Sequence, residues 1–216
     1  MKPLDLYLVR HGEIVGEGDY IGGGSDPDLS DLGRRQAEGV AGLLRRVPLE
    51  RIHTSPLRRA RAAAGMVAAL CEAPGPELRV HQDLREIHFG LWEGLRFGDL
   101  DGPGRELALS WAADPRLSRP PGGEGFEDFR ERVLRCFDGI EKEHSGGPVL
   151  VAAHGGTLRV YLSRVLGLTA DRFWRFGLAR GSLSLVRVYP RGPAVLEFLN
   201  LRLDPAGTPV VRSDRP

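Results

Sequence analysis

Two histidines in this sequence stand where apolar runs end, and each is followed by glycine. In "LYLVRHGE", residues 6–13, the run ends at Arg10 and His11, and in "VLVAAHGG", residues 149–156, it ends at His154. Ligands of open α/β sheets bind beyond the carboxyl ends of the strands, so both imidazoles could face one pocket. One histidine at a strand end is usually only a polar terminus, but the repeated arrangement favours a shared site. Arg10 adds a forked donor of the kind that suits phosphate.

The elements that must position these residues alternate between strand and helix. Ser30 is a plausible N-cap for one helix, and Pro56 suits the first position of the next. The patterns predict strands at 4–9, 51–55, 148–153, 182–189 and 194–201, and helices at 29–47, 56–70, 124–144 and 157–165. This alternation predicts one α/β domain over residues 1–216, with three layers (α/β/α) and a mostly parallel mixed central sheet.

Three stretches fit no regular element. Residues 15–28 form a glycine-rich loop, and residues 88–124 contain Trp92, Trp111 and several glycines and prolines. Long loops beyond strand ends often contact substrate, so 88–124 is a candidate lid; an inserted helix without a role is the alternative. The tail, 204–216, lacks periodicity, and we expect it to be loosely held.

Composition excludes several function classes. The 216 residues include 30 basic and 29 acidic ones, so no excess of positive charge favours nucleic acid or an anionic membrane. No apolar run is long enough for a signal peptide or a membrane span. The cysteines, Cys71 and Cys136, lack metal-ligand spacing, and a reduced cytoplasmic setting is the simplest interpretation.

Five motifs in order carry a family resemblance. "LVRHGE", "SPLRRA", "LREIHFGLWEG", "PPGGE" and "VAAHGG", spread over residues 6–156, resemble the histidine phosphatase superfamily, whose namesake is phosphoglycerate mutase. The resemblance implies a phosphoglycerate mutase-like fold with His11 as the nucleophile that forms a phosphohistidine. It implies that Arg10 and Arg59 hold the phosphoryl group and that His154 stabilises it. Backbone N–H groups around Gly155, where a helix opens, would suit the same anion.

The resemblance also implies a proton donor and a pocket rim. Glu86 matches the acid that protonates the leaving oxygen; from the residues alone, a surface salt bridge with Arg85 is the alternative. Residues with a weaker claim to substrate contact are Glu17, Tyr20, His88, Trp92, Trp111 and Glu124. Trp92 and Trp111 could instead only pack the lid. Many members have Ser or Thr and Asn where this sequence has Ile14 and Glu17, and a glutamate there would repel phosphate. His53, His81 and His144 are expected to be structural or exposed.

These features predict a phosphomonoesterase that acts on a small phosphorylated metabolite. The motifs resemble most the α-ribazole phosphatase branch, which acts in cobalamin synthesis; a phosphoglycerate mutase and a broad-specificity sugar phosphatase are alternatives. A mutase is less favoured because the segment before "PPGGE" lacks paired arginines. A catalytically dead phosphate-binding protein is the alternative from another class. We expect no cofactor and no catalytic metal, because no ligands stand at metal spacing, and a homodimer is one possible assembly.

Overall fold

The computed structural model describes residues 2–16, 21–72, 75–203 and 208–210. The strands are β1 (Leu4–Arg10), β2 (Arg51–Thr54), β3 (Glu77–Val80), β4 (Gly147–Ala153), β5 (Leu183–Val188) and β6 (Ala194–Leu201). The helices are α1 (Asp31–Leu44), α2 (Arg58–Leu70), α3 (Gly102–Ala113), α4 (Phe126–Glu143) and α5 (Gly155–Val165).

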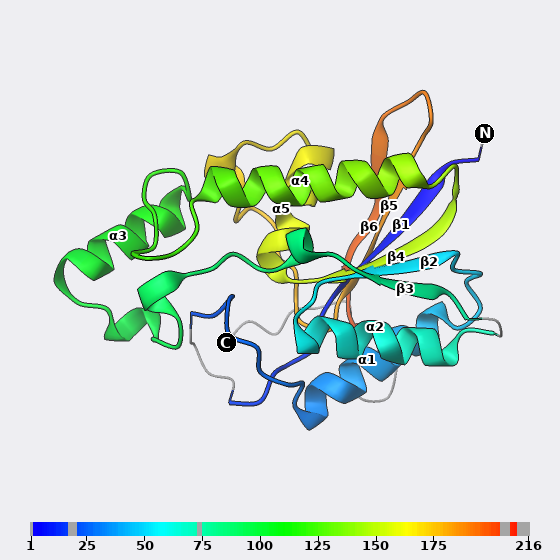
Figure 1. Ribbon diagram of the computed structural model, residues 1–216, viewed down its shortest axis with the longest axis horizontal. Coiled ribbons are helices and arrows are strands. Elements are labelled where there is room, and N and C mark those ends of the chain that lie inside the picture. Colours follow the sequence, from blue (N-terminus) through cyan, green and yellow to red (C-terminus); the bar gives the residue numbers. More distant parts are fainter. Residues whose placement is uncertain (1, 17–20, 73–74, 204–207, 211–216) are drawn as a thin grey trace.

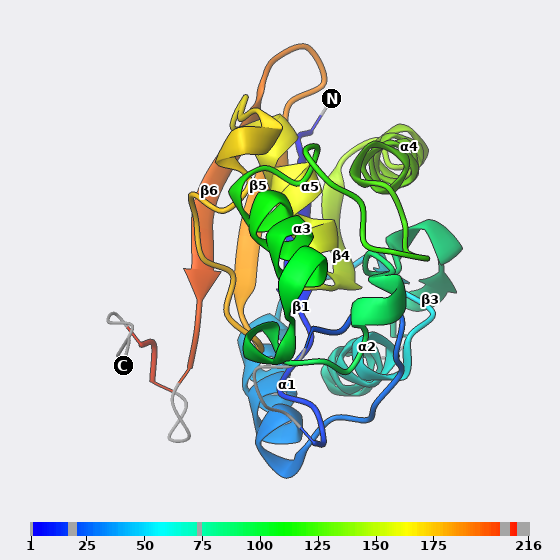
Figure 2. The same ribbon diagram turned by 90° about the vertical axis from the view of Figure 1, so that its left-hand side faces the viewer.

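The strands form one mixed sheet in the order β3-β2-β4-β1-β5-β6. The β1 to β4 strands run parallel to one another, whereas β5 is antiparallel to both β1 and β6. Helices α1 and α2 cover one face of the sheet, and α4 and α5 cover the other (Figures 1 and 2). The expected three-layer α/β/α fold with a mostly parallel sheet is therefore confirmed.

Strand β4 shows why both faces must be covered. Val149 and Val151 pack into the cluster under α4 and α5, whereas Leu150 and Ala152 pack into the cluster under α1 and α2. Successive side chains of a strand point to opposite faces, so a continuous apolar run requires a helix layer on each side. The predicted stripe of α4 is equally clear: its buried residues are Phe126, Phe129, Val133, Phe137 and Ile140.

The boundaries of two helices differ from the prediction. Ser30 caps α1 as expected, and its Oγ accepts a hydrogen bond from the Gly33 N–H at 3.0 Å. Helix α2 begins at Arg58, so Pro56 precedes the helix; Leu57 has extended backbone. Helix α5 begins at Gly155, two residues before the predicted start. Strand β3 was not predicted, because it is a largely exposed edge strand without a buried apolar pattern.

The candidate lid is more regular than the sequence suggested. Residues 102–113 form helix α3, which lies beyond the carboxyl end of β1, far from the amino-terminal edge of the sheet (Figure 1). Of the expected tail, the structure describes 208–210, where Val210 N–H bonds to the carbonyl of Arg202 at 2.8 Å. Within the described part of the chain, no helix combines the length and the apolar character needed to cross a membrane.

Candidate active site

The pairing of β1 with β4 brings the two histidines together. Arg10 lies opposite Ala153 in the parallel register, so the next residue of each strand, His11 and His154, leaves the sheet at the same edge. The His11 N–H bonds to the Ala153 carbonyl at 3.1 Å, and the two imidazole centroids are 5.1 Å apart. The structure thus joins two residues that are 143 positions apart, as the repeated strand-end pattern predicted.

The surroundings of His11 determine which of its ring nitrogens carries the proton. Nδ1 lies 2.7 Å from the Gly12 carbonyl, which can only accept, so Nδ1 carries the proton and Nε2 keeps a lone pair. Burial lowers the pKa of His11 well below its usual value, and the charges of Arg10 and Arg59 lower it further. Arg59 Nε donates to His11 Nε2 at 3.3 Å. A neutral imidazole therefore lies beside a permanent cation.

Arg59 is itself held by the glycine-rich loop. Its Nη1 donates to the Ser25 carbonyl at 2.6 Å and its Nη2 to the Gly23 carbonyl at 3.1 Å. The Glu93 carboxylate fixes this loop, because it accepts from the N–H groups of Gly23 at 3.0 Å and Gly24 at 2.7 Å. Glu93 was not singled out in the sequence, although it belongs to the motif "LWEG".

Arg10 lies against the start of α5. Its guanidinium donates to the Leu178 carbonyl, and a Cβ on Gly155 would come within 3.1 Å of Arg10 Cζ. Burial lowers the pKa of Arg10, whereas the Glu86 charge raises it, and the group stays cationic at neutral pH. The glycine at 155 thus leaves room for one of the two predicted phosphate-binding arginines.

His154 is fully buried and is oriented by Ser55. Ser55 Oγ accepts from the Leu57 N–H at 3.3 Å, so its own proton is available for His154 Nε2, 2.7 Å away. His154 Nδ1 then carries a proton, and no partner for it exists among the described residues. Burial lowers the pKa of His154 well below its usual value, with further lowering by His11 and Arg59. Nδ1–H can therefore donate to a phosphoryl oxygen.

The carboxylate of Glu86 lies at the N-terminus of α5. Its carboxylate accepts from the N–H groups of Gly156 at 2.7 Å, Thr157 at 3.2 Å and Ile87 at 3.0 Å. The expected anion position at this helix terminus is thus taken in part by a side chain of the protein, because the free N–H groups and helix dipole favour any carboxylate within reach. A Cβ on Gly156 would stand 2.4 Å from Glu86 Oε1. The alternative, a surface salt bridge between Glu86 and Arg85, does not form among the described residues.

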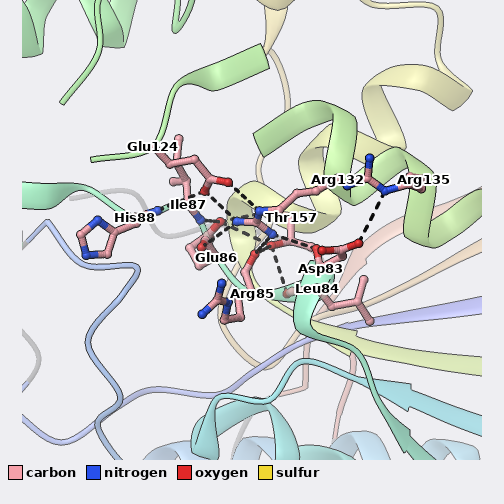
Figure 3. A network of polar contacts seen from close by, with 10 residues as sticks. All are labelled: Asp83, Leu84, Arg85, Glu86, Ile87, His88, Glu124, Arg132, Arg135 and Thr157. Atoms are coloured by element: carbon pink, nitrogen blue, oxygen red, sulfur yellow. Dashed lines mark hydrogen bonds and ion pairs between the residues drawn. The ribbon is translucent and has the colours of Figure 1, made fainter. Parts of the chain in front are cut away.

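Arg132 on α4 holds the segment that carries Glu86 (Figure 3). It donates to the carbonyls of Asp83 at 2.8 Å, Arg85 at 2.9 Å and Glu86 at 3.2 Å. Its guanidinium also forms a two-point ion pair with Glu124, at 2.6 and 2.7 Å. Sequence reasoning missed Arg132, because on the helix pattern it is only a polar residue beside the apolar stripe.

The weaker sequence predictions have mixed outcomes. Glu124 bonds through its backbone N–H to the His88 carbonyl at 2.8 Å, so it links the lid to the Glu86 segment. The imidazole of His88 points away from this network (Figure 3). Trp92 and Trp111 are only 3% and 8% exposed, so they pack the lid and do not offer a face to substrate. Glu17 and Tyr20 lie outside the described residues.

A further arginine lines a cavity next to Arg10. The cavity has a volume of about 420 Å³, and Arg10, Glu13, Gln36, Arg180 and Arg202 are among its lining residues. Burial lowers the pKa of Arg180 to about 10, with a further lowering by Arg10, so Arg180 remains a cation at neutral pH. Its charge also lowers the pKa of His11. Arg180 lies in the short segment "LARGS", which belongs to none of the five family motifs.

Comparisons with known proteins agree with this geometry. A profile of the histidine phosphatase superfamily (branch 1) matches residues 6–201. An adenosylcobalamin/α-ribazole phosphatase from Salmonella typhimurium is 33% identical over 92% of this chain and 97% of its own length. Phosphoserine phosphatase 1 from Hydrogenobacter thermophilus is 31% identical over 90% of this chain and 92% of its own. A bifunctional protein from Mycobacterium tuberculosis is 34% identical over 92% of this chain, which spans about half (54%) of that relative's length.

Solved structures agree in fold. The α-ribazole phosphatase from Shigella flexneri has a TM-score of 0.81 at 29% identity, covering 91% of this chain and 96% of its own. A mycobacterial glucosyl-3-phosphoglycerate phosphatase has a TM-score of 0.77 at 28% identity, covering 92% and 99%. The chain therefore belongs to branch 1 of the histidine phosphatase superfamily.

Proposed function

We propose that this protein is a phosphomonoesterase that hydrolyses a small phosphorylated metabolite through a phosphohistidine on His11. The observation that carries the proposal is the state of His11: Nδ1 is bound to the Gly12 carbonyl, and Nε2 faces Arg59 in a buried site. A neutral imidazole with its lone pair turned toward a cation is arranged to attack an electron-poor phosphorus.

The transfer would proceed in two balanced steps. In the first, His11 Nε2 forms a bond to phosphorus, the bond from phosphorus to the ester oxygen breaks, and protonated Glu86 gives its proton to that oxygen. In the second, the Glu86 carboxylate takes a proton from water, the water oxygen bonds to phosphorus, and the bond to Nε2 breaks. Arg10, Arg59 and His154 Nδ1–H would bind the three peripheral oxygens, where charge builds up in both transition states.

Rapid quench after mixing with radiolabelled substrate tests the intermediate. We expect an acid-labile, alkali-stable label on the protein during turnover, and neither label nor turnover in a His11→Asn variant. A His11→Asn protein that still turns over, or a wild type that hydrolyses substrate without ever carrying label, would contradict the proposal. A wild type that takes up label but does not release phosphate would indicate a mutase, and one that binds substrate but neither takes up label nor releases phosphate would indicate a catalytically dead binder.

For the substrate, we propose α-ribazole 5'-phosphate first, on the strength of the similarity to α-ribazole phosphatases.

The geometry of the lid disfavours a mutase. Arg116 is bound to Asp114, and Arg119 Nε donates to the Gly123 carbonyl at 2.9 Å, so both arginines stabilise the lid itself. Neither is set to hold a second acidic group of a reorienting intermediate.

A second candidate is a substrate with a carboxylate or another acid near its phosphate. Arg180 supports it, because this half-buried cation lines the cavity beside Arg10. Phosphoserine and glucosyl-3-phosphoglycerate, which appear in the names of two similar proteins, each have an acidic group near the phosphate. A stack of the α-ribazole ring on Trp92 or Trp111 is not part of the proposal, since both rings are buried.

The two candidates differ in kcat/KM across a substrate panel. The panel comprises α-ribazole 5'-phosphate, phosphoserine, glucosyl-3-phosphoglycerate, a neutral sugar phosphate, and 3-phosphoglycerate primed with its bisphosphate. Arg180→Gln should lower kcat/KM for the acidic substrates about 10-fold or more, as loss of a charged hydrogen bond predicts. The matched control is Arg172→Gln, an exposed arginine with a weak contact to Asp171. An equal effect on all substrates would refute the acidic subsite, and dominant phosphoglycerate interconversion would refute the phosphatase.

A further inference from the structure

Three histidines from distant parts of the chain meet under the carboxyl-terminal end of α4. His53 lies on β2, His81 follows β3, and His144 follows the last residue of α4. His53 Nδ1 is 2.8 Å from His81 Nε2, and His53 Nε2 is 3.0 Å from His144 Nε2. His53 is fully buried, and only 7% of the His144 side chain is exposed. None of the three takes part in the proposed phosphoryl transfer.

An acidic residue completes a set of metal-ligand atoms. One ligand atom each from His53, His144 and the adjacent Glu143 all lie within 4.8 Å of one another. We propose that these three residues bind a divalent transition-metal ion, with Zn²⁺ as the best fit. Two imidazoles and a carboxylate are a donor set that zinc accepts in tetrahedral geometry, with the fourth position left to water. The site goes beyond the proposed phosphatase activity and does not depend on it.

The contact between His53 and His144 needs little adjustment to accept the ion. Two nitrogens bound to one tetrahedral Zn²⁺ at about 2.05 Å are about 3.3 Å apart. His53 Nε2 and His144 Nε2 are already 3.0 Å apart. The ion would replace the one proton that these two nitrogens share, so the rings need to separate by only a few tenths of an ångström.

One of the two ligating histidines already has a partner at its other nitrogen. A metal-bound histidine nearly always donates its remaining N–H to an acceptor, which fixes the tautomer. For His53 Nδ1 that acceptor would be His81 Nε2, 2.8 Å away. The Glu50 carboxylate lies 3.8 Å from His144 Nδ1, too far for a hydrogen bond but close enough to favour a positive charge on this side of the cluster.

The surroundings allow access but also add an opposing charge. Glu143 is exposed, and a cavity of about 370 Å³ reaches both Glu143 and His81, so an aqueous ion can approach. Arg79 bonds to Glu143 Oε1, and Arg51 Nε lies 3.6 Å from the same oxygen. These two cations compete with the metal for Glu143, so we expect the histidine pair to supply most of the affinity.

The ion would serve as a structural link. It would join strand β2 to the end of α4, where Arg51 of β2 already lies 3.6 Å from the carboxylate of Glu143. Ser55 follows His53 by two residues and contacts His154, so the link lies near the active site without sharing a residue with it. We therefore expect bound Zn²⁺ to raise thermal stability and to leave turnover unchanged.

The test is a titration of the full-length, EDTA-treated protein with Zn²⁺ in competition with a chromophoric chelator. We expect one ion per chain, and a rise in Tm of about 5 to 10 °C at about 100-fold excess over Kd. His144→Gln should weaken binding about 100-fold or more, and His81→Gln about 10- to 100-fold, as loss of an outer partner does. Exposed His88→Gln is the matched control and should bind as wild type does.

The catalytic pair is a competing site for Zn²⁺, so His11→Asn is part of the same experiment. Binding that persists in His11→Asn and is lost in His144→Gln supports the proposal. Binding lost in His11→Asn instead, or unchanged in His144→Gln, or absent from wild type, overturns it. Should His144→Gln not fold in EDTA, X-ray absorption of the loaded wild type decides: two imidazoles and one carboxylate support the site, and any other ligand set refutes it.

Discussion

Replacement of Arg132 by methionine separates a positioning role from a purely structural one. Methionine keeps the length and helix preference of the side chain but removes the ion pair with Glu124 and the bonds to three carbonyls of the segment 83–86. Only 12% of the Arg132 side chain and 20% of the Glu124 side chain are exposed. The Thr157 hydroxyl still bonds to the Arg85 carbonyl at 3.0 Å, and the Glu86 carboxylate still accepts from the Gly156 N–H, so the segment keeps its tethers to α5.

The structure sets the size of the effect. Hydrogen bonds to charged groups contribute about 1.5 to 3 kcal/mol each, and the retained bonds to α5 limit the loss, so we expect the free energy of unfolding to fall by about 2 to 4 kcal/mol. General acid catalysis contributes about 10² to 10⁴ in rate, which is the upper limit for displacing Glu86. A shift of about 1 Å in the carboxylate costs about 10²-fold, and we expect that loss in kcat/KM for an alkyl phosphate.

The assay compares two leaving groups. An alkoxide must be protonated as it departs, whereas p-nitrophenolate leaves without a proton, and kcat/KM reports the steps up to formation of the phosphohistidine. Arg132→Met should therefore cost about 10²-fold for the alkyl phosphate but less than about 5-fold for p-nitrophenyl phosphate. Arg130→Met, which removes an exposed ion pair on the same helix, is the control and should change neither.

Two results would refute the reasoning. An equal loss with both substrates would mean that Arg132 supports only the fold or the phosphate site. A further loss from Arg132→Met in a Glu86→Gln background would mean that the arginine acts other than through the carboxylate, because residues that act as one unit are not additive.

Three other changes test separate parts of the site. Gly156→Ala places a Cβ 2.4 Å from Glu86 Oε1, so kcat for alkyl phosphates should fall about 10²-fold with little change for p-nitrophenyl phosphate; equal loss for both contradicts this. Glu93→Ala removes the acceptor of the loop that holds Arg59, so KM should rise about 10-fold and more than kcat falls; an unchanged KM refutes the link. Because the pKa of folded His11 is well below its usual value, the unfolded chain binds one more proton below about pH 6.5, and stability is lost as pH falls. His11→Asn should reduce that slope by about 1.4 kcal/mol per pH unit in urea unfolding, and an unchanged slope shows an ordinary pKa.

Local patterns in the sequence were sufficient to predict the elements that pack against the hydrophobic core. The buried run of β4 predicted a strand covered on both faces, and the stripe of α4 predicted a helix with one buried face. Edge strand β3 was missed, and the helix at α3 was only the alternative for its segment, for the converse reason. Neither buries a continuous apolar face, and the spacing of apolar residues reveals a helix or strand only where one face is buried.

The sequence by itself determined that two histidines stand at strand ends, since His11 and His154 are recognisable from an apolar run that stops at a polar residue and a glycine. Tertiary structure alone decided which polar groups support them. Arg132 reaches the Glu86 carbonyl across 46 residues, and His53 meets His144 across 91. A hydrogen bond or a metal-ligand set depends on the distance between atoms in space, and chain separation places no limit on that distance once helices and strands have packed. Such contacts leave no period in the sequence, and only the packed sheet and helices bring them together.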